Sequence, residues 1–213
     1  MKIKLLAYAV VVCLISCTKT VQNEVEVYGN DFDTADLTHI TNGRIIKFNN
    51  TAVLGNYNND GFALTINDLP KHDLVTISYD LYIHDSWDGN KLAPDGPDIF
   101  SMLVDGNPYI NASFSNSPCG VGVFCEPQSY PLDYPNNYSN PKAGAFRTDL
   151  PGLCNLATNP NGTTLYKIQK TIRHSKSTLI LQCLDKLIQT NTADPKCDES
   201  WSVDNIRIKA IAL

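Results

Sequence analysis

Oxygen-donor side chains are concentrated in residues 85–98, where the sequence DSWDGN ends an alternating apolar run and further aspartates follow. Calcium (Ca²⁺) in proteins takes roughly six to eight oxygen ligands, mostly from carboxylates and carbonyls. Asp88, Asn90 and Asp98 can supply several of them, so the sequence predicts a calcium site in this loop. Aspartate and asparagine also cap tight turns, and an ordinary turn without an ion is the alternative.

Aromatic residues indicate a second kind of chemistry, which is stacking on sugar rings. Trp87, Tyr130 and Tyr134 are predicted to contact a ligand, and Tyr138 follows them in the same part of the chain. Aromatic side chains combine a broad apolar face with a defined contact geometry. For Trp87, as for Trp201, the alternative is a position in the hydrophobic core.

The sequence does not predict an enzyme. It contains no G-x-S-x-G or H-E-x-x-H motif and no phosphate-binding loop. Glycoside hydrolysis needs two carboxyl groups roughly 5–9.5 Å apart. Asp198 and Glu199 are adjacent and therefore face opposite ways on a strand. We predict no catalytic residues.

Residues 1–16 have the organisation of a secretory signal peptide. Lys2 and Lys4 form a short basic region, and residues 5–15 are an apolar run of eleven. A run of that length suits a signal peptide and is shorter than the roughly 18–20 residues that span a bilayer. We therefore expect an exported protein from which residues 1–16 are removed.

Residues 14–17 (LISC) resemble the bacterial lipobox, in which an aliphatic residue and two tolerant positions precede a cysteine. The resemblance implies cleavage before Cys17 and lipid attachment to its thiol, with acyl chains such as palmitate. Each buried methylene group contributes about 0.8 kcal/mol, so several acyl chains anchor a protein stably. We expect a bacterial lipoprotein at the outer membrane or cell surface, with residues 17–27 as a polar tether.

The charge balance argues against nucleic acid as a partner. The chain has 17 Lys and Arg residues and 22 Asp and Glu residues, for a formal net charge of −5, and loss of Lys2 and Lys4 with the signal peptide makes it −7. Nucleic-acid-binding proteins need a basic surface that neutralises phosphates. Contact with a membrane is therefore expected through the lipid rather than through charge.

Five of the seven cysteines lie beyond the leader and tether. Exported domains meet an oxidising compartment, which favours disulfides. Cys183 ends a strand-like run and Cys197 precedes the next one, so we predict a Cys183–Cys197 bridge. The other three share a loop-rich segment, and any two of them can pair: Cys119, Cys125 and Cys154. A zinc site is disfavoured, because the sequence has no C-x₂-C pair.

Apolar and polar residues alternate with a period of two through most of the chain, which is typical of strands with one buried face. The predicted strands are residues 62–66, 75–83, 100–104, 109–114, 165–172, 178–183 and 203–211. Short strands at this spacing, with turns between them, predict an all-β fold, an antiparallel sandwich formed by residues 28–213. Residues 118–160 lack this alternation and are predicted to be a long loop insertion.

Four motifs resemble a jelly-roll domain of extracellular proteins from bacteria and ciliates. They are LPKH at residues 69–72, DSWDGN at 85–90, VDG at 104–106 and ESWSVDN at 199–205. The match covers about residues 30–210, and the broader similarity is to concanavalin-like and galactose-binding-like sandwiches. The resemblance implies an antiparallel jelly-roll β-sandwich and implies no particular activity.

The resemblance also implies a second calcium site. Terminal strands often pair in jelly rolls, and related sandwiches place a structural calcium near such a pair. Asp31-Phe32-Asp33 opens the domain and Asp204-Asn205 lies in its last predicted strand. We predict that Asp33 and Asp204 are ligands there.

The leading functional hypothesis is a surface-anchored, non-catalytic binding module for glycan or protein, stabilised by calcium. The alternatives are a structural or adhesive subunit of a surface assembly and, less favoured, an enzyme similar to glycoside hydrolases. A protein partner and a glycan partner both remain open at this stage.

Overall fold

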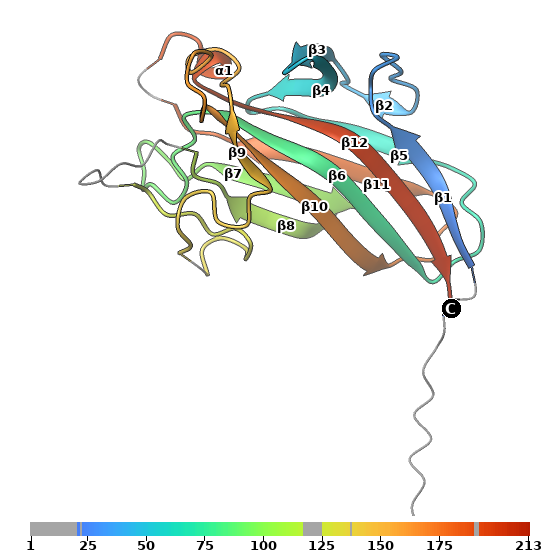
Figure 1. The fold of residues 1–213 in the computed structure, drawn as a ribbon. Helices are drawn as coiled ribbons and strands as arrows, with labels where there is room; N and C mark the ends of the chain where they lie inside the picture. The colour runs from blue at the N-terminus through green and yellow to red at the C-terminus, as the bar shows by residue number, and fades with distance from the viewer. Residues whose placement is uncertain (1–20, 22, 117–124, 137, 190–191) are drawn as a thin grey trace, which may run out of the picture.

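A computed structural model describes residues 21, 23–116, 125–136, 138–189 and 192–213. It confirms the predicted all-β, antiparallel jelly-roll β-sandwich, with two sheets packed face to face (Figure 1). Cys17 and Cys119 lie outside the described residues. Within the described residues, no helix is long and apolar enough to cross a membrane.

The larger sheet has the strand order β3-β4-β12-β6-β10-β9, and β1 pairs with β12. Its strands are β1 (Asn23–Asn30), β3 (Ile45–Phe48), β4 (Thr51–Tyr57), β6 (Leu74–Asp85), β9 (Arg147–Leu150), β10 (Thr163–Arg173) and β12 (Glu199–Ala212). The smaller sheet has the order β2-β5-β11-β7-β8. Its strands are β2 (Ile40–Thr41), β5 (Gly61–Ile66), β7 (Ile99–Val104), β8 (Asn107–Ser113) and β11 (Leu179–Lys186). A short helix, α1 (Pro195–Asp198), precedes β12.

The core lies between the two sheets. Alternate side chains of β6 from Val75 to Ile83 face it, and each is at most 2% exposed, as the period-two pattern predicts. Trp201 of β12 and Phe100 of β7 meet there with ring centroids 5.0 Å apart. The Trp201 indole N–H donates to Asp185 Oδ1 of β11 at 2.8 Å, so this residue connects the sheets by packing and by a hydrogen bond.

The last part of β6 is buried on both faces, because a smaller hydrophobic cluster covers the outer face of the larger sheet. The cluster contains Phe48, Val53, Tyr82, Leu150 and Leu165. His84 is fully buried, with its ring 4.6 Å from that of Phe48. The imidazole hydrogen-bonds with Thr163 Oγ1 at 3.0 Å and with Ser202 Oγ at 2.7 Å. Burial lowers the pKa of His84 to about 3.

We expect acid to destabilise the fold through His84. Its pKa is lower in the folded protein than in the unfolded chain, where it is about 6.5, so the unfolded state binds more protons below that pH. The stabilisation is complete above pH 6.5 and is lost as the pH falls towards 3. Between pH 6.5 and pH 5 the expected loss is about 1.5 kcal/mol.

Chemical denaturation of the wild type and of His84→Gln at pH 6.5 and pH 5 measures this loss. Glutamine keeps a donor and an acceptor for Thr163 and Ser202 but does not titrate, and the other histidines are present in both proteins. The wild type should lose about 1.5 kcal/mol more than the variant. Equal losses in the two proteins would show that His84 does not limit acid stability.

The structure changes the predicted disulfide pairing. Cys154 and Cys197 form a disulfide with their Cα atoms 5.0 Å apart, so the predicted Cys183–Cys197 bridge is wrong. Cys183 is a free thiol and is 1% exposed. It shares the inward face of β11 with Leu181, whereas Cys197 lies in α1 at the end of the sandwich. Cys125 is also disulfide-bonded.

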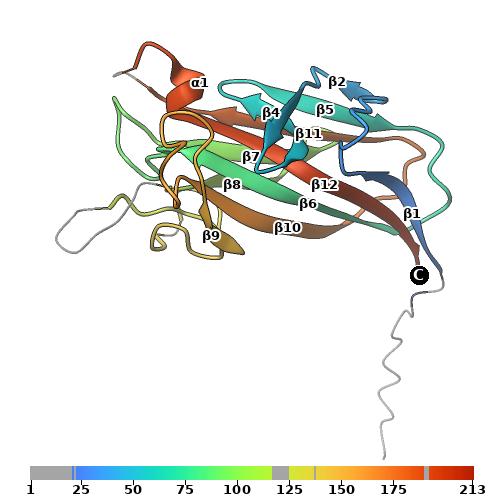
Figure 2. The same cartoon turned by 45° about the horizontal axis from the view of Figure 1, so that its top comes forward.

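The two ends of the sandwich differ. Asn23 at the start of β1 pairs with Ala212 near the end of β12, so the chain enters and leaves the domain at one end, which we name the terminal end (Figures 1 and 2). The opposite end, named the loop end, holds Asp85 at the end of β6, together with α1. Because β6 has 12 residues, the two ends are about 35–40 Å apart.

Candidate functional site

A pocket of about 420 Å³ opens at the loop end. Its lining side chains are all polar or charged: Ser86, Asp88, Lys91, Asn155, Gln189, Thr192 and Asp198. The volume lies within the range of small-molecule sites, roughly 300–1,000 Å³, although such sites usually have a mostly apolar lining. We name this site the loop-end pocket.

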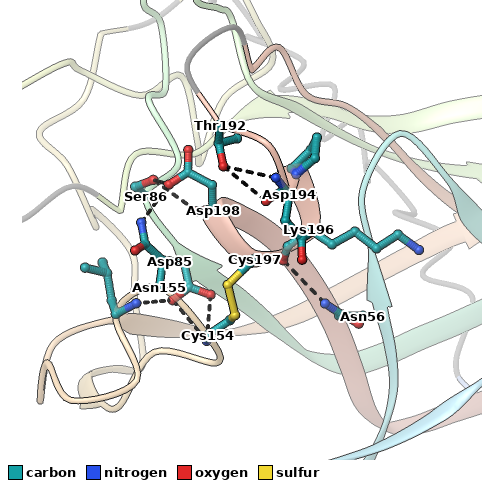
Figure 3. Close-up of a disulfide and its surroundings, with 12 residues drawn as sticks. Asn56, Asp85, Ser86, Cys154, Asn155, Thr192, Asp194, Lys196, Cys197 and Asp198 are labelled. Atoms are coloured by element: carbon teal, nitrogen blue, oxygen red, sulfur yellow. Dashed lines mark hydrogen bonds between the residues drawn. A yellow bond between two sulfur atoms is a disulfide. The ribbon is translucent and has the colours of Figure 1, made fainter.

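The wall that carries Asn155 is fixed by Asp85 and by the disulfide (Figure 3). The Asp85 carboxylate accepts hydrogen bonds from the backbone N–H groups of Leu156 at 2.8 Å and Cys154 at 3.3 Å. The Cys154–Cys197 bond then connects this wall to α1, which carries Asp198. Each bridged cysteine thus directly precedes a pocket residue in the sequence.

Asp198 organises the polar groups of the pocket. Its Oδ1 accepts hydrogen bonds from Ser86 Oγ at 3.0 Å and from Asn155 Nδ2 at 2.8 Å (Figure 3). Lys91 Nζ lies 2.8 Å from Asp88 Oδ2. The lining therefore has two carboxylates and one ammonium group, together with amides and hydroxyls that donate and accept hydrogen bonds.

Two more acidic side chains meet at the loop end inside the sandwich. Asp98 directly precedes β7 of the smaller sheet and Glu199 begins β12 of the larger sheet, and both are 0% exposed. Their carboxyl groups are in contact. Burial raises the pKa of both groups, and repulsion by Asp98 and Asp88 raises the pKa of Glu199 further. Apart from this contact with Asp98, neither carboxylate oxygen of Glu199 has a hydrogen-bond partner in the described part of the chain.

The structure brings together two of the three predicted ligands of the loop calcium site. Asp98 Oδ2 accepts the backbone N–H of Asp88 at 2.5 Å. Asn90 is buried, and its Oδ1 accepts a hydrogen bond from the Ser113 hydroxyl of β8. Across the described ranges, no three His, Cys, Asp or Glu side chains are grouped closely enough to hold a metal ion as they stand. Calcium in this loop stays a prediction.

The second predicted calcium site lies where β1 ends beside β12. This pairing brings Asp33 close enough to Asp204 to raise its pKa. Burial is the main cause of the raised pKa of Asp204, about 6, and Asp80, Asp33 and Asp31 contribute repulsion. Asp33 Oδ1 also accepts a hydrogen bond from Thr51 Oγ1 at 3.1 Å. A calcium ion held by Asp33 and Asp204 also stays a prediction.

Of the predicted aromatic ligand contacts, the one assigned to Trp87 is wrong. Trp87 is 0% exposed, and its indole N–H donates to the Ser200 carbonyl at 2.9 Å, so its ring belongs to the core. Tyr130 is half-buried and stacks on Phe114 with ring centroids 4.8 Å apart. Tyr134 is half-buried, and neither tyrosine lines the loop-end pocket. Ligand contacts by Tyr130 and Tyr134 stay predictions.

A second pocket, of about 370 Å³, lies towards the terminal end. It is lined by Asp73, Val104, Asp105, Asn107, Tyr109, Ile172, Arg173, His174, Ser175 and Lys176. Asp105 Oδ2 lies 2.9 Å from Lys176 Nζ and 3.4 Å from His174 Nε2, so much of its charge is already paired. Asp73, in its wall, accepts a hydrogen bond from the backbone N–H of Leu213. Because this pocket lies beside the chain ends, we take the loop-end pocket as the candidate site.

Sequence reasoning missed several residues of the loop end. Asn155, Gln189 and Thr192 lie outside the strands, where no periodicity marks them. The sequence analysis identifies Glu199 only as a neighbour of Asp198. Glu199 precedes Trp201 by two residues, so the two side chains lie on the same face of β12. Because Trp201 is a core residue, this spacing is the signal that places Glu199 inside the sandwich.

No family model matches the chain, and no curated protein matches it. Similar solved structures include dimeric latent PorU from Porphyromonas gingivalis, with a TM-score of 0.39, 8% identity and coverage of 70% of this chain and 10% of that one. The CBM22-2 xylan-binding domain of Xyn10C from Paenibacillus barcinonensis has a TM-score of 0.38 and 12% identity, covering 86% and 99%. A family 35 carbohydrate binding module from Clostridium thermocellum has a TM-score of 0.34 and 10% identity, covering 79% and 88%.

The chain spans about a tenth of the length of PorU. All three TM-scores are below 0.5 and all three identities are at most 12%, so these similarities assign no function.

Proposed function

We propose that the chain is a non-catalytic module that binds neutral glycans in the loop-end pocket. The observation that carries the proposal is the lining of this pocket, which consists of hydroxyl, amide, carboxylate and ammonium groups. Each sugar hydroxyl both donates and accepts hydrogen bonds, so a glycan can pair with all four kinds of group. A hydrophobic ligand would instead leave these polar groups without partners, at a cost in affinity.

The charge of the pocket favours a neutral glycan over an acidic one. Asp88 and Asp198 face one cationic group, Lys91, and Lys91 already pairs with Asp88. A sulfate, phosphate or uronate on the sugar would be repelled by the remaining carboxylate. The formal net charge of the chain, −5, acts in the same direction at longer range.

The buried acid pair, Asp98 and Glu199, is not arranged for glycoside hydrolysis. Asp98 and Glu199 are in contact, but each is 0% exposed and neither lines the pocket. A glycoside hydrolase presents its two carboxyl groups to the scissile bond, with one on each side of it. These two carboxyl groups are enclosed between the sheets and cannot do so in this arrangement.

The proposal includes a lipid anchor on Cys17, which lies outside the described residues. The start of β1 at Asn23, only a few residues further along the chain, is at the terminal end. An anchor there would hold the terminal end next to the membrane. The loop-end pocket, about 35–40 Å away along β6, would then face outward.

A glycan array probed with the wild type, with Gln189→Ala and with Asn107→Ala tests the pocket assignment. We expect the wild type to bind neutral oligosaccharides. Gln189→Ala should bind them about 5–10-fold more weakly, because one hydrogen bond to a ligand contributes about 1–1.5 kcal/mol.

Asn107→Ala is the matched control, because Asn107 lines the second pocket. It should bind like the wild type. If no neutral glycan is bound, or if Asn107→Ala loses binding while Gln189→Ala keeps it, the proposed function is incorrect.

A further inference from the structure

Among the described residues, Glu199 differs from the other buried carboxylates in accepting no hydrogen bond from an N–H or hydroxyl donor. Asp185 accepts hydrogen bonds from the Trp201 indole at 2.8 Å and from the Asn59 backbone at 2.6 Å. Asp85 accepts backbone N–H groups of the disulfide loop. Glu199 is 0% exposed, and apart from its contact with Asp98 neither of its carboxylate oxygens has a hydrogen-bond partner among the described residues. A buried carboxylate without a donor is strongly disfavoured unless something positive pairs with it.

The neighbouring carboxylates make the burial of a charged Glu199 still less favourable. Its carboxylate contacts that of Asp98, and Asp88 is close enough to repel it as well. Asp98 accepts backbone N–H groups from Asp88 at 2.5 Å and Ile188 at 3.3 Å, but these donors do not reach Glu199. The cationic side chain of Lys91 pairs with Asp88, 2.8 Å away. A positive charge between Asp98 and Glu199 would remove the repulsion.

We propose that Glu199 and Asp98 hold a calcium ion at the loop end, between the two sheets. Calcium accepts oxygen ligands at flexible angles, and two carboxylates can provide up to about four of its six to eight ligands. Backbone carbonyls and water would supply the remainder. In this assignment Glu199 takes the place that the sequence analysis assigned to Asn90.

A calcium ion here would join the two sheets at one point. Asp98 leads into β7 of the smaller sheet and Glu199 begins β12 of the larger sheet. It would also hold the backbone of Asp88, which lines the loop-end pocket, through the hydrogen bond to Asp98. The inference does not depend on the proposed glycan function, because the ion alone is the probe.

Calorimetric titration of calcium chloride into the purified protein, after treatment with EDTA, tests the site. We expect binding of calcium, and a rise in melting temperature of roughly 5–10 °C when calcium exceeds its dissociation constant a hundredfold. Magnesium should bind much more weakly, because it prefers a strict octahedral arrangement and keeps its water. Glu199→Gln should weaken calcium binding by at least a hundredfold.

Two further variants locate the ion. Asp149→Asn removes the same charge from an exposed, ion-paired residue and should bind calcium like the wild type. Asp204→Asn removes the acid near the end of β1. If Asp204→Asn abolishes binding and Glu199→Gln does not, the ion is held elsewhere and the inference is overturned. If the wild type binds no calcium and Glu199→Gln raises the melting temperature, the two acids share a proton instead, which also overturns it.

Discussion

Replacing Trp201 with alanine is expected to lower the free energy of unfolding by about 4–6 kcal/mol. Trp201 is 0% exposed and packs against Tyr57 and Phe100, with ring centroids 4.8 and 5.0 Å from its own. Removal of a buried aromatic side chain costs about 3–5 kcal/mol. Asp185 also loses the indole N–H, and the loss of that hydrogen bond adds about 1 kcal/mol or more.

Denaturant titration followed by circular dichroism measures this change. Trp201→Phe keeps much of the packing but removes the N–H group, so it should show a smaller loss of about 1–3 kcal/mol. Leu184→Ala is the control on the smaller sheet, because Leu184 is 38% exposed, and it should cost less than about 1 kcal/mol. A loss in Trp201→Ala no larger than in Leu184→Ala would contradict the described core.

Removal of the Cys154–Cys197 disulfide is expected to cost about 4 kcal/mol. The two cysteines are 43 residues apart, and the chain-entropy model gives this value for a loop of that length. In a domain of this size the melting temperature should fall by roughly 8–16 °C. Because the bond connects the walls that carry Asn155 and Asp198, glycan affinity should fall as well.

The double variant Cys154→Ser/Cys197→Ser gives the measurement, with thermal unfolding as the readout. Cys183→Ala is the comparison, since it removes a buried thiol without breaking a bond, and it should change the melting temperature much less. Peptide mapping of the non-reduced wild type should recover residues 154 and 197 in one linked peptide pair. A linked pair containing Cys183 would refute the pairing.

The strands were largely predictable because their pattern is local. Alternation predicts a strand over residues 75–83, and β6 runs from Leu74 to Asp85. The alternation in burial stops at Tyr79, after which every residue of β6 is buried, because side chains of β3, β4 and β9 pack with Tyr82 and Leu165 on the outer face of the sheet. Contacts of that kind join distant parts of the chain and leave no periodic signal.

The disulfide and the loop end were less predictable for the same reason. Cys183 and Cys197 both lie near strand ends in the sequence, but the position of Cys183 on the inward face of β11 excludes it from a bridge to α1. The sequence identified Asp88 and Asp98 through their spacing. It could not place Glu199 beside them, because about a hundred residues and a change of sheet separate it from Asp98.

Hydrogen exchange with and without the neutral oligosaccharide that binds best is the most direct test of the glycan site. The account predicts slower exchange in residues 152–157 and 192–199, which form the walls of the loop-end pocket, and no change in residues 104–109 and 172–176 around the second pocket. Slower exchange confined to the second pocket, or unchanged exchange throughout the protein at a saturating glycan concentration, would contradict it.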